Sequence, residues 1–264
     1  MIMTRLYPLF SGSSGNCYYL GSPESGVLID TGRSAKQIEQ ALRDNSLDPK
    51  RVSAVFITHE HTDHIQGLRV FASRYGVKVY SSPGTMRAME EKGYINEKVD
   101  ISPIDLSGME TDDMRITPFH TSHDCAEGYG YIIESSDGRK TAFATDTGYI
   151  TQEMSKAVTG CDTVVIESNH DVRMLESGPY PYILKKRILS DKGHLSNETC
   201  AGFLAGLIKS GTTRLMLAHL SRENNIPALA EQTAVCELTL SGMQRDRDFM
   251  LRVAPERGGK MLIY

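Results

Sequence analysis

The chain lacks the long apolar run that a membrane-spanning helix needs. Although 40% of its residues are hydrophobic, no stretch approaches the roughly 18 to 20 consecutive apolar residues that cross a bilayer. The N-terminal sequence MIMTRLYPLF also lacks a long apolar core followed by a small-residue cleavage site. We therefore expect a cytoplasmic protein with no membrane partner.

Paired cysteines are missing as well. The five cysteines are widely spaced, and no two of them form a CxxC pair: Cys17, Cys125, Cys161, Cys200 and Cys236. An odd number in this pattern disfavours a disulfide framework and a zinc site made of thiolates. We expect reduced cysteines packed in the core.

An excess of positive charge is also absent. The net charge of −4 at pH 7 argues against attraction of nucleic acid to the whole surface, but it leaves room for a local basic groove. Residues 172–194 carry a net charge of +3, from Arg173, Lys185, Lys186, Arg187 and Lys192 against Glu176 and Asp191. Either a solvated helix face or a docking surface for a phosphate backbone explains this segment.

No internal repeat, low-complexity tract or linker interrupts the chain, and short apolar runs alternate with amphipathic segments. Strands are predicted at 4–10, 16–21, 26–30, 51–58, 77–82, 114–119, 129–136, 139–146, 162–168, 214–220, 249–255 and 260–264. Helices are predicted near 34–45, 65–75, 84–92, 151–158, 181–190, 197–209 and 226–241, with a start signal at Ser196 or Asn197 and a stop signal at Gly211. The pattern favours a single α/β domain over residues 1–264.

The sequence HEHTDH concentrates possible metal ligands in six residues. It lies between the predicted strand 51–58 and the following helix, so His59 and His61 are expected to converge on one ion from a turn. Asp63 and His64 are expected to face a neighbouring position. Imidazole and carboxylate together suit zinc, manganese or iron rather than calcium. Three histidines here would repel one another when protonated, which favours a metal site over a chance cluster.

A second metal ion needs further ligands. Asp146 ends an apolar strand abruptly, and a carboxylate there can bridge two cations. An isolated aspartate in this position would more simply cap a turn, but the nearby histidine cluster favours a ligand. The residue pattern alone does not choose among the other histidines: His120, His123, His170, His194 and His219.

The arrangement HxHxDH, followed by a strand-end aspartate and later histidines, resembles the metallo-β-lactamase superfamily over essentially the whole chain. In detail it is more similar to the bacterial YycJ/WalJ group, relatives of the RNase Z and RNase J nucleases. The motifs that carry this closer resemblance are SGSSGN at 11–16, LIDTG at 28–32, THEHTDHIQG at 58–67, TSHD at 121–124, ATDTG at 144–148, ESNHD at 167–171, GHLSNE at 193–198 and HLSRENN at 219–225.

The resemblance implies an α/β fold, a four-layer αββα sandwich with a dinuclear metal site. It assigns His59, His61 and His123 to one ion, Asp63, His64 and His219 to the other, and Asp146 to both. The two divalent ions are expected to be zinc or manganese, with iron as a further option. Asp30, at the end of a strand, is expected to be a buried acid that orients a ligand histidine.

The resemblance also implies the reaction, phosphodiester hydrolysis by a 5′-to-3′ DNA exonuclease. Asp63 is expected to orient the nucleophile, and His194, which is not a ligand, to approach the scissile phosphate or the leaving oxygen. His120 is expected to be a packed or supporting residue. Candidate substrate-binding residues are Ser13, Ser14, Asn16, His170, Lys185, Lys186 and Arg222, although SGSSG is also a plain turn and His170 equally suits packing.

One departure from the RNase J relatives concerns the cap domain that they insert after the bridging aspartate. Asp146 and His194 are only 48 residues apart, so no cap domain is expected here. Two alternatives stay open at this point. The same metals serve hydrolases of thioesters or amides that resemble glyoxalase II or lactamases, and the fold also serves as a metal-containing binding module that acts through partners.

Overall fold

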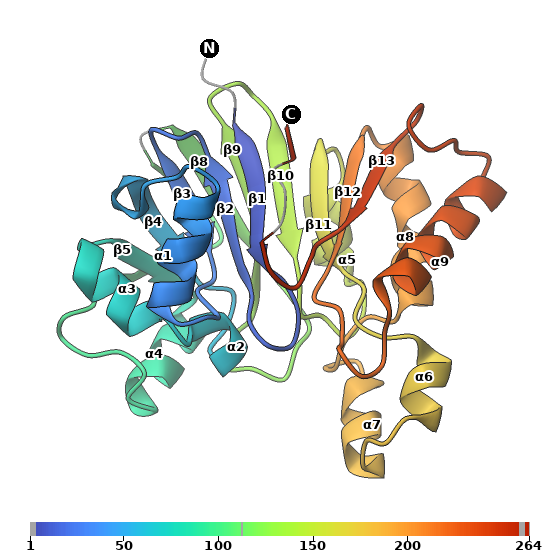
Figure 1. Ribbon diagram of the computed structural model, residues 1–264, viewed down its shortest axis with the longest axis horizontal. Helices are drawn as coiled ribbons and strands as arrows, with labels where there is room; N and C mark the ends of the chain where they lie inside the picture. Colours follow the sequence, from blue (N-terminus) through green and yellow to red (C-terminus); the bar gives the residue numbers. More distant parts are fainter. Residues whose placement is uncertain (1–3, 112, 259–261, 264) are drawn as a thin grey trace. The chain divides into compact units, whose positions relative to one another are not determined.

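The computed structural model describes residues 4–111, 113–258 and 262–263. The chain divides into two compact units, each associated with one seven-stranded sheet (Figure 1). Unit 1 comprises Met1–Met109, Cys125–Tyr129 and Pro255–Tyr264, and unit 2 comprises Glu110–Asp124 and Gly130–Ala254. The expectation of one domain without an inserted cap stays a prediction.

The sheet of unit 1 has the strand order β14-β1-β2-β3-β4-β5-β6. Its strands are β1 (Arg5–Phe10), β2 (Cys17–Gly21), β3 (Gly26–Ile29), β4 (Val52–Phe56), β5 (Lys78–Ser81), β6 (Ile101–Pro103) and β14 (Leu262–Ile263). From β3 to β6 the neighbours are parallel. Parallel pairing brings the carboxyl ends of β3 and β4 to the same edge, where the loops that begin at Asp30 and Ile57 follow.

Helices of unit 1 bury their apolar faces against this sheet. They are α1 (Ala35–Asp44), α2 (Thr62–Ile65), α3 (Leu68–Tyr75) and α4 (Pro83–Glu91), with a short 3₁₀ helix at Pro49–Arg51. Ile38 of α1 and Phe71 of α3 share one hydrophobic core with Val55 of β4. Ser34 caps α1 by accepting a hydrogen bond from the Gln37 N–H.

The sheet of unit 2 has the strand order β13-β12-β11-β10-β9-β8-β7. Its strands are β7 (Met109–Glu110), β8 (Met114–His120), β9 (Tyr129–Ser135), β10 (Lys140–Ala144), β11 (Thr163–Glu167), β12 (Arg214–Ala218) and β13 (Met250–Val253). The neighbours from β10 to β13 are parallel. The carboxyl ends of β10, β11 and β12 therefore meet at one edge.

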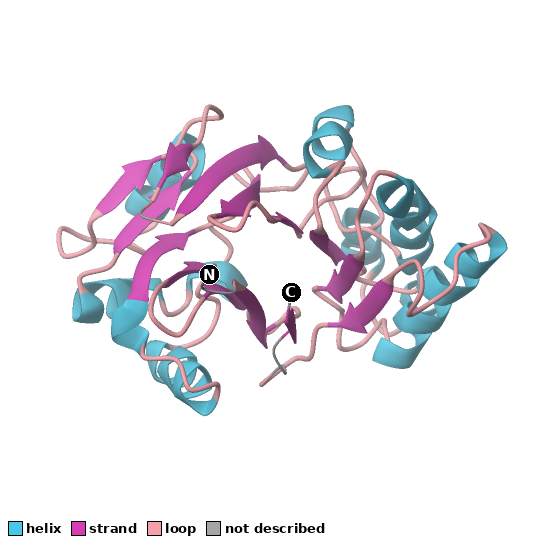
Figure 2. Ribbon diagram, turned by 90° about the horizontal axis from the view of Figure 1, so that it is seen from above, coloured by secondary structure: helices cyan, strands magenta, loops and turns pink. Residues whose placement is uncertain are grey.

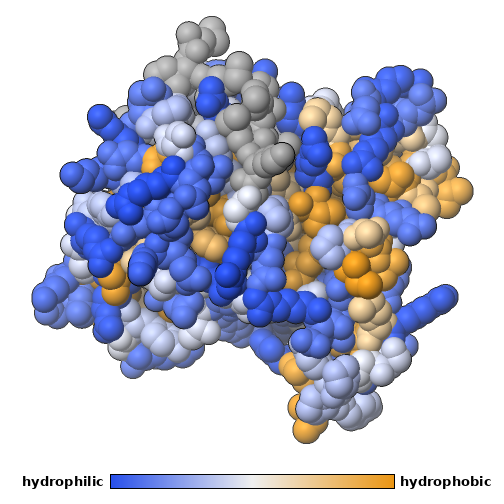
Figure 3. Space-filling model, in the orientation of Figure 1, coloured by the Kyte–Doolittle hydropathy of each residue, from blue (hydrophilic) through white to orange (hydrophobic). Residues whose placement is uncertain are grey.

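Helices α5 (Gln152–Val158), α8 (Asn197–Lys209) and α9 (Pro227–Leu240) share a core with this sheet. Figures 1 and 2 show α8 and α9 side by side next to β12 and β13. Two shorter helices, α6 (Val172–Ser177) and α7 (Tyr182–Ile188), form a hairpin. The surface in Figure 3 is mainly hydrophilic, yet α7 exposes Tyr182 by 70% and Ile183 by 82%.

The expected strands are confirmed, except that residues 260, 261 and 264 lie outside the described part of the chain. The predicted helix 65–75 was wrong at its start, because the structure has two helices there, α2 and α3. Gly67 separates them, and a Cβ at this position would lie 2.2 Å from the Arg33 carbonyl oxygen. The short elements β6, β7 and α6 were not predicted. Among the described helices, none has the length and apolarity to cross a membrane.

Candidate metal centre

The first group of site residues lies in unit 1, on the loops after β3 and β4. The Asp30 carboxylate is completely buried. It accepts hydrogen bonds from the Thr58 N–H at 2.8 Å, the Thr58 hydroxyl at 2.9 Å and His64 Nδ1 at 2.7 Å. Burial raises the pKa of Asp30, although His64 and Thr58 favour its charged form. With its proton on Nδ1, His64 carries its lone pair on Nε2, the form that binds a metal.

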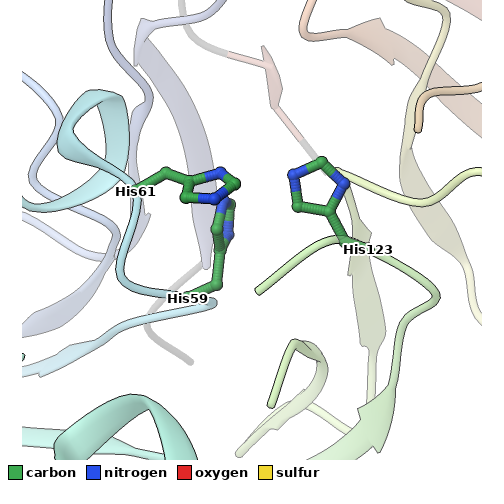
Figure 4. Close-up of side chains that lie close together, drawn as sticks. All are labelled: His59, His61 and His123. Atoms are coloured by element: carbon green, nitrogen blue, oxygen red, sulfur yellow. The ribbon is translucent and has the colours of Figure 1, made fainter. Parts of the chain in front are cut away.

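The histidines of HEHTDH lie next to one another. The ring centroids of His59 and His61 are 4.5 Å apart, and those of His59 and His64 are 4.1 Å apart. Figure 4 shows the imidazoles of His59 and His61 on the loop that follows β4. Asp63 and His64 lie on α2, and Asp63 Oδ2 is 3.5 Å from His64 Nε2. Unit 1 thus brings together all four possible ligands of this motif.

Glu60, between two of these histidines, had no role in the sequence analysis. It is buried, accepts a hydrogen bond from the Ala126 N–H at 3.0 Å and lies 3.6 Å from Lys92 Nζ. The Tyr129 N–H donates to the Thr58 carbonyl at 2.9 Å. These contacts fix the histidine loop against residues 125–129.

Asn16, a candidate substrate-binding residue, lies inside the fold of unit 1. Its side chain is completely buried, binds the Gly12 N–H at 3.0 Å and lies 3.1 Å from His64 Nε2. Gly32 packs on the same turn, and a Cβ there would lie 1.6 Å from the Asp63 carbonyl oxygen. Asn16 therefore supports the loop that carries Asp63 and His64, and its role in substrate binding stays a prediction.

The second group lies in unit 2, at the shared edge of β10, β11 and β12. Asp146, Glu167, His194 and His219 each place a possible ligand atom within 4.8 Å of the others. His219 Nδ1 is 3.3 Å and His194 Nδ1 is 3.8 Å from Asp146 Oδ1. Because β10, β11 and β12 are parallel neighbours, the residues that follow them lie close together although they are far apart in the sequence.

Glu167 belongs to this group, although the sequence analysis gave it no role. Its buried carboxylate accepts from His194 Nδ1 at 2.7 Å and from His219 Nδ1 at 2.8 Å. Burial opposes the charged form, but the two histidines outweigh it and lower the pKa of Glu167 to about 2. An acid that ends the apolar run TVVI was the available signal, the same one that identified Asp30 and Asp146.

His123 follows β8 on a loop of unit 2 (Figure 4). Its Nδ1 donates to the Gly193 carbonyl at 3.0 Å, which places its lone pair on Nε2. The neighbouring Ser122 hydroxyl donates a hydrogen bond to the Asp191 carbonyl at 2.7 Å. Arg187 forms a bidentate ion pair with Asp124. The segment 187–193 thereby holds the His123 loop in place.

Among the described residues, His120 and His170 belong to neither group of possible metal ligands. His120 has a 42% exposed side chain and bonds Glu153 Oε1 through Nδ1 at 3.0 Å. His170 is 1% exposed, and its role in packing or in substrate contact stays a prediction. Within the described residues, neither of its ring nitrogens has a hydrogen-bond partner.

The other candidate substrate residues are more accessible. Ser13 and Arg222 are exposed, whereas the Ser14 hydroxyl contacts Arg33 and, at 3.0 Å, Glu256. On the α6–α7 hairpin, Lys185 Nζ donates to the Glu176 carbonyl at 2.7 Å and Lys186 Nζ lies 5.1 Å from the Tyr182 ring centroid.

Comparison with known proteins identifies the class to which this fold and these groups belong. The chain belongs to the β-lactamase superfamily, whose domain model matches residues 26–220. It is 40% identical to exodeoxyribonuclease WalJ of Streptococcus pneumoniae, over 91% of this chain and 90% of that protein. It is 41% identical to exodeoxyribonuclease YycJ of Bacillus anthracis, over 85% of each.

A solved structure supports the same fold. The metallo-β-lactamase fold protein YhfI from Bacillus subtilis superposes with a TM-score of 0.71 over 99% of this chain and 100% of that one, at 14% identity. The expected α/β metallo-β-lactamase fold and the resemblance to the YycJ/WalJ group are therefore confirmed.

Proposed function

We propose that the chain is a metal-dependent phosphodiester hydrolase that degrades DNA as a 5′-to-3′ exonuclease. Its similarity to two exodeoxyribonucleases over at least 85% of its length supports this function. The structural observation that carries the proposal is the pair of His194 and Glu167 beside Asp146. A histidine held in this way suits proton donation to a leaving alkoxide.

The proposed ligands fit divalent zinc or manganese, because the donors are imidazole nitrogens and carboxylate oxygens. We assign His59, His61 and His123 to one ion, Asp63, His64 and His219 to the other, and Asp146 to both. In three of these histidines Nδ1 bonds an oxygen of Asp30, Gly193 or Glu167, the orientation usual for ligating imidazoles. When bound, such ions acidify water and neutralise phosphate charge.

Three residues of the chain have the remaining roles in the proposed reaction. Asp63, with a 25% exposed side chain, orients the attacking water. His194, with a 14% exposed side chain, donates a proton from Nε2 to the leaving oxygen. Glu167, whose pKa of about 2 keeps it ionised, fixes the ring through Nδ1 and stabilises the protonated imidazole.

The variant His194→Ala tests this proposal. It should retain the metal content of the wild type and cleave DNA about 10²–10⁴-fold more slowly, the usual effect of losing a general acid. Bis(4-nitrophenyl) phosphate has a leaving group that needs no proton, so its hydrolysis should be much less affected. His120→Ala, which removes a histidine bonded to Glu153 at the surface, is the matched control. Equal losses on both substrates, or a wild type that hydrolyses a thioester but not DNA, would contradict the proposal.

A further inference from the structure

Unit 1 contains a pocket of about 480 Å³ next to Asp63. Its wall includes Ser13, Asp63, Gln66, Arg69, Val70 and Tyr94. Its volume lies in the range of about 300–1,000 Å³ that is common for small-ligand sites. The pocket combines hydroxyl, amide and guanidinium groups with an aromatic ring and an aliphatic side chain, a set of groups that suits a nucleotide.

Arg69 differs from the other basic residues near this region. Arg33 contacts Glu256, Arg74 pairs with Glu39, and Lys92 lies 3.6 Å from Glu60. Arg69 on α3 is exposed and lines the pocket, and no described residue forms an ion pair with it. Its planar guanidinium is thus available for a phosphate or for a base edge.

Tyr94 is presented by a fixed turn. It follows the end of α4, where the Gly93 N–H donates to the Glu90 carbonyl at 3.0 Å and the Tyr94 N–H donates to the Met89 carbonyl at 2.9 Å. Gly93 has φ +67°, so this is a helix end closed by a left-handed glycine. The Tyr94 ring is 37% exposed and Val70 is 45% exposed, which leaves an apolar surface on which a base can stack.

We propose that this pocket binds the terminal nucleotide of the DNA strand, with its base against Tyr94 and Val70 and its phosphate or base edge at Arg69. The inference rests on the proposed function, because Asp63 belongs both to the pocket wall and to the reacting centre. An occupant of the pocket therefore lies next to a residue of the proposed reacting centre. The pocket would select a nucleotide end and set the size of the released product.

Two substrates and two pairs of variants test the proposal. Tyr94→Ala should raise the KM for an oligodeoxynucleotide roughly 5- to 150-fold, the range for loss of one base–aromatic stack, and Arg69→Ala should raise it at least about 10-fold, as expected for loss of a hydrogen bond to a charged group. Hydrolysis of bis(4-nitrophenyl) phosphate, which carries neither base nor sugar, should be much less affected. The matched controls are Arg87→Ala, an exposed arginine on α4, and Leu106→Ala, which is 45% exposed. Neither lines the pocket, so both should behave as the wild type.

A terminal 2-aminopurine provides a second readout. Its fluorescence should be quenched on binding to the wild type and to the controls but not to Tyr94→Ala, whereas an internal 2-aminopurine should not distinguish them. The pocket assignment is overturned if Arg69→Ala and Tyr94→Ala match their controls on DNA, or if they lose activity equally on both substrates. A wild type that hydrolyses neither diester overturns the proposed function itself, and the occupant with it.

Discussion

At the scale of residues, the candidate site contains strained backbone. Asp30, Asp146 and His219 have φ values of 61°, 58° and 55°. Each lies just beyond the end of a strand, in a left-handed conformation that costs a non-glycine residue about 1–3 kcal/mol. The surrounding hydrogen bonds of Asp30 and Glu167 hold this geometry in place.

His170 leads to a prediction about stability against pH. Burial lowers the pKa of His170 to about 4, although the Glu167 carboxylate acts in the opposite direction. The folded state therefore binds the proton less readily than the unfolded state, whose histidine titrates near about 6.5. The contribution of His170 to the free energy of unfolding is therefore fully present above that pH. As the pH falls toward 4, the free energy of unfolding decreases by about 3 kcal/mol.

Urea unfolding of wild type and His170→Gln at pH 7, 6, 5 and 4 measures this effect. The free energy of unfolding of the variant should fall less steeply than that of the wild type across this window. His120→Gln, whose side chain is 42% exposed in the parent protein, is the control for the loss of a histidine at the surface. Parallel curves for wild type and His170→Gln would show that His170 does not titrate with this depressed pKa.

At the scale of elements, the long regular parts of the fold could be predicted and the short ones could not. Strands such as β12 and β11 are continuous apolar runs, and Ser196 caps α8 as expected by accepting from the Thr199 N–H. β6 and β7 have three and two residues, too few for any periodicity to appear. The split between α2 and α3 depends on the close approach of the Arg33 carbonyl to Gly67, a tertiary contact that local sequence does not encode.

The basic α6–α7 hairpin carries the prediction at this scale. If it guides a polyanion, Lys185→Glu with Lys186→Glu should raise the KM for long DNA more than they lower kcat, and wild-type cleavage should fall steeply with salt. The double variant Lys156→Glu with Lys209→Glu makes the same charge change at exposed positions on α5 and α8 and is the control. If neither double variant changes the cleavage of long DNA, the DNA-binding surface lies elsewhere.

For the whole molecule, the sequence predicted which residues belong to the candidate site better than it predicted the contacts between them. Asp30 and Asp146 could be found because an acid abruptly ends an apolar strand. Glu167 shows the same pattern, but its importance comes from contacts with His194 and His219, which are 27 and 52 residues away. Those contacts follow from the parallel order of β10, β11 and β12. Such an order needs tertiary packing and cannot be derived from local periodicity.

We propose that one carboxylate, that of Asp146, binds both metal ions. Elemental analysis of purified wild type, Asp146→Ala and His219→Ala tests it most directly, with circular dichroism to confirm that each variant is folded. We predict two divalent ions per chain in the wild type, loss of both in Asp146→Ala and loss of mainly one in His219→Ala. A folded Asp146→Ala protein that retains two ions per chain would contradict the account.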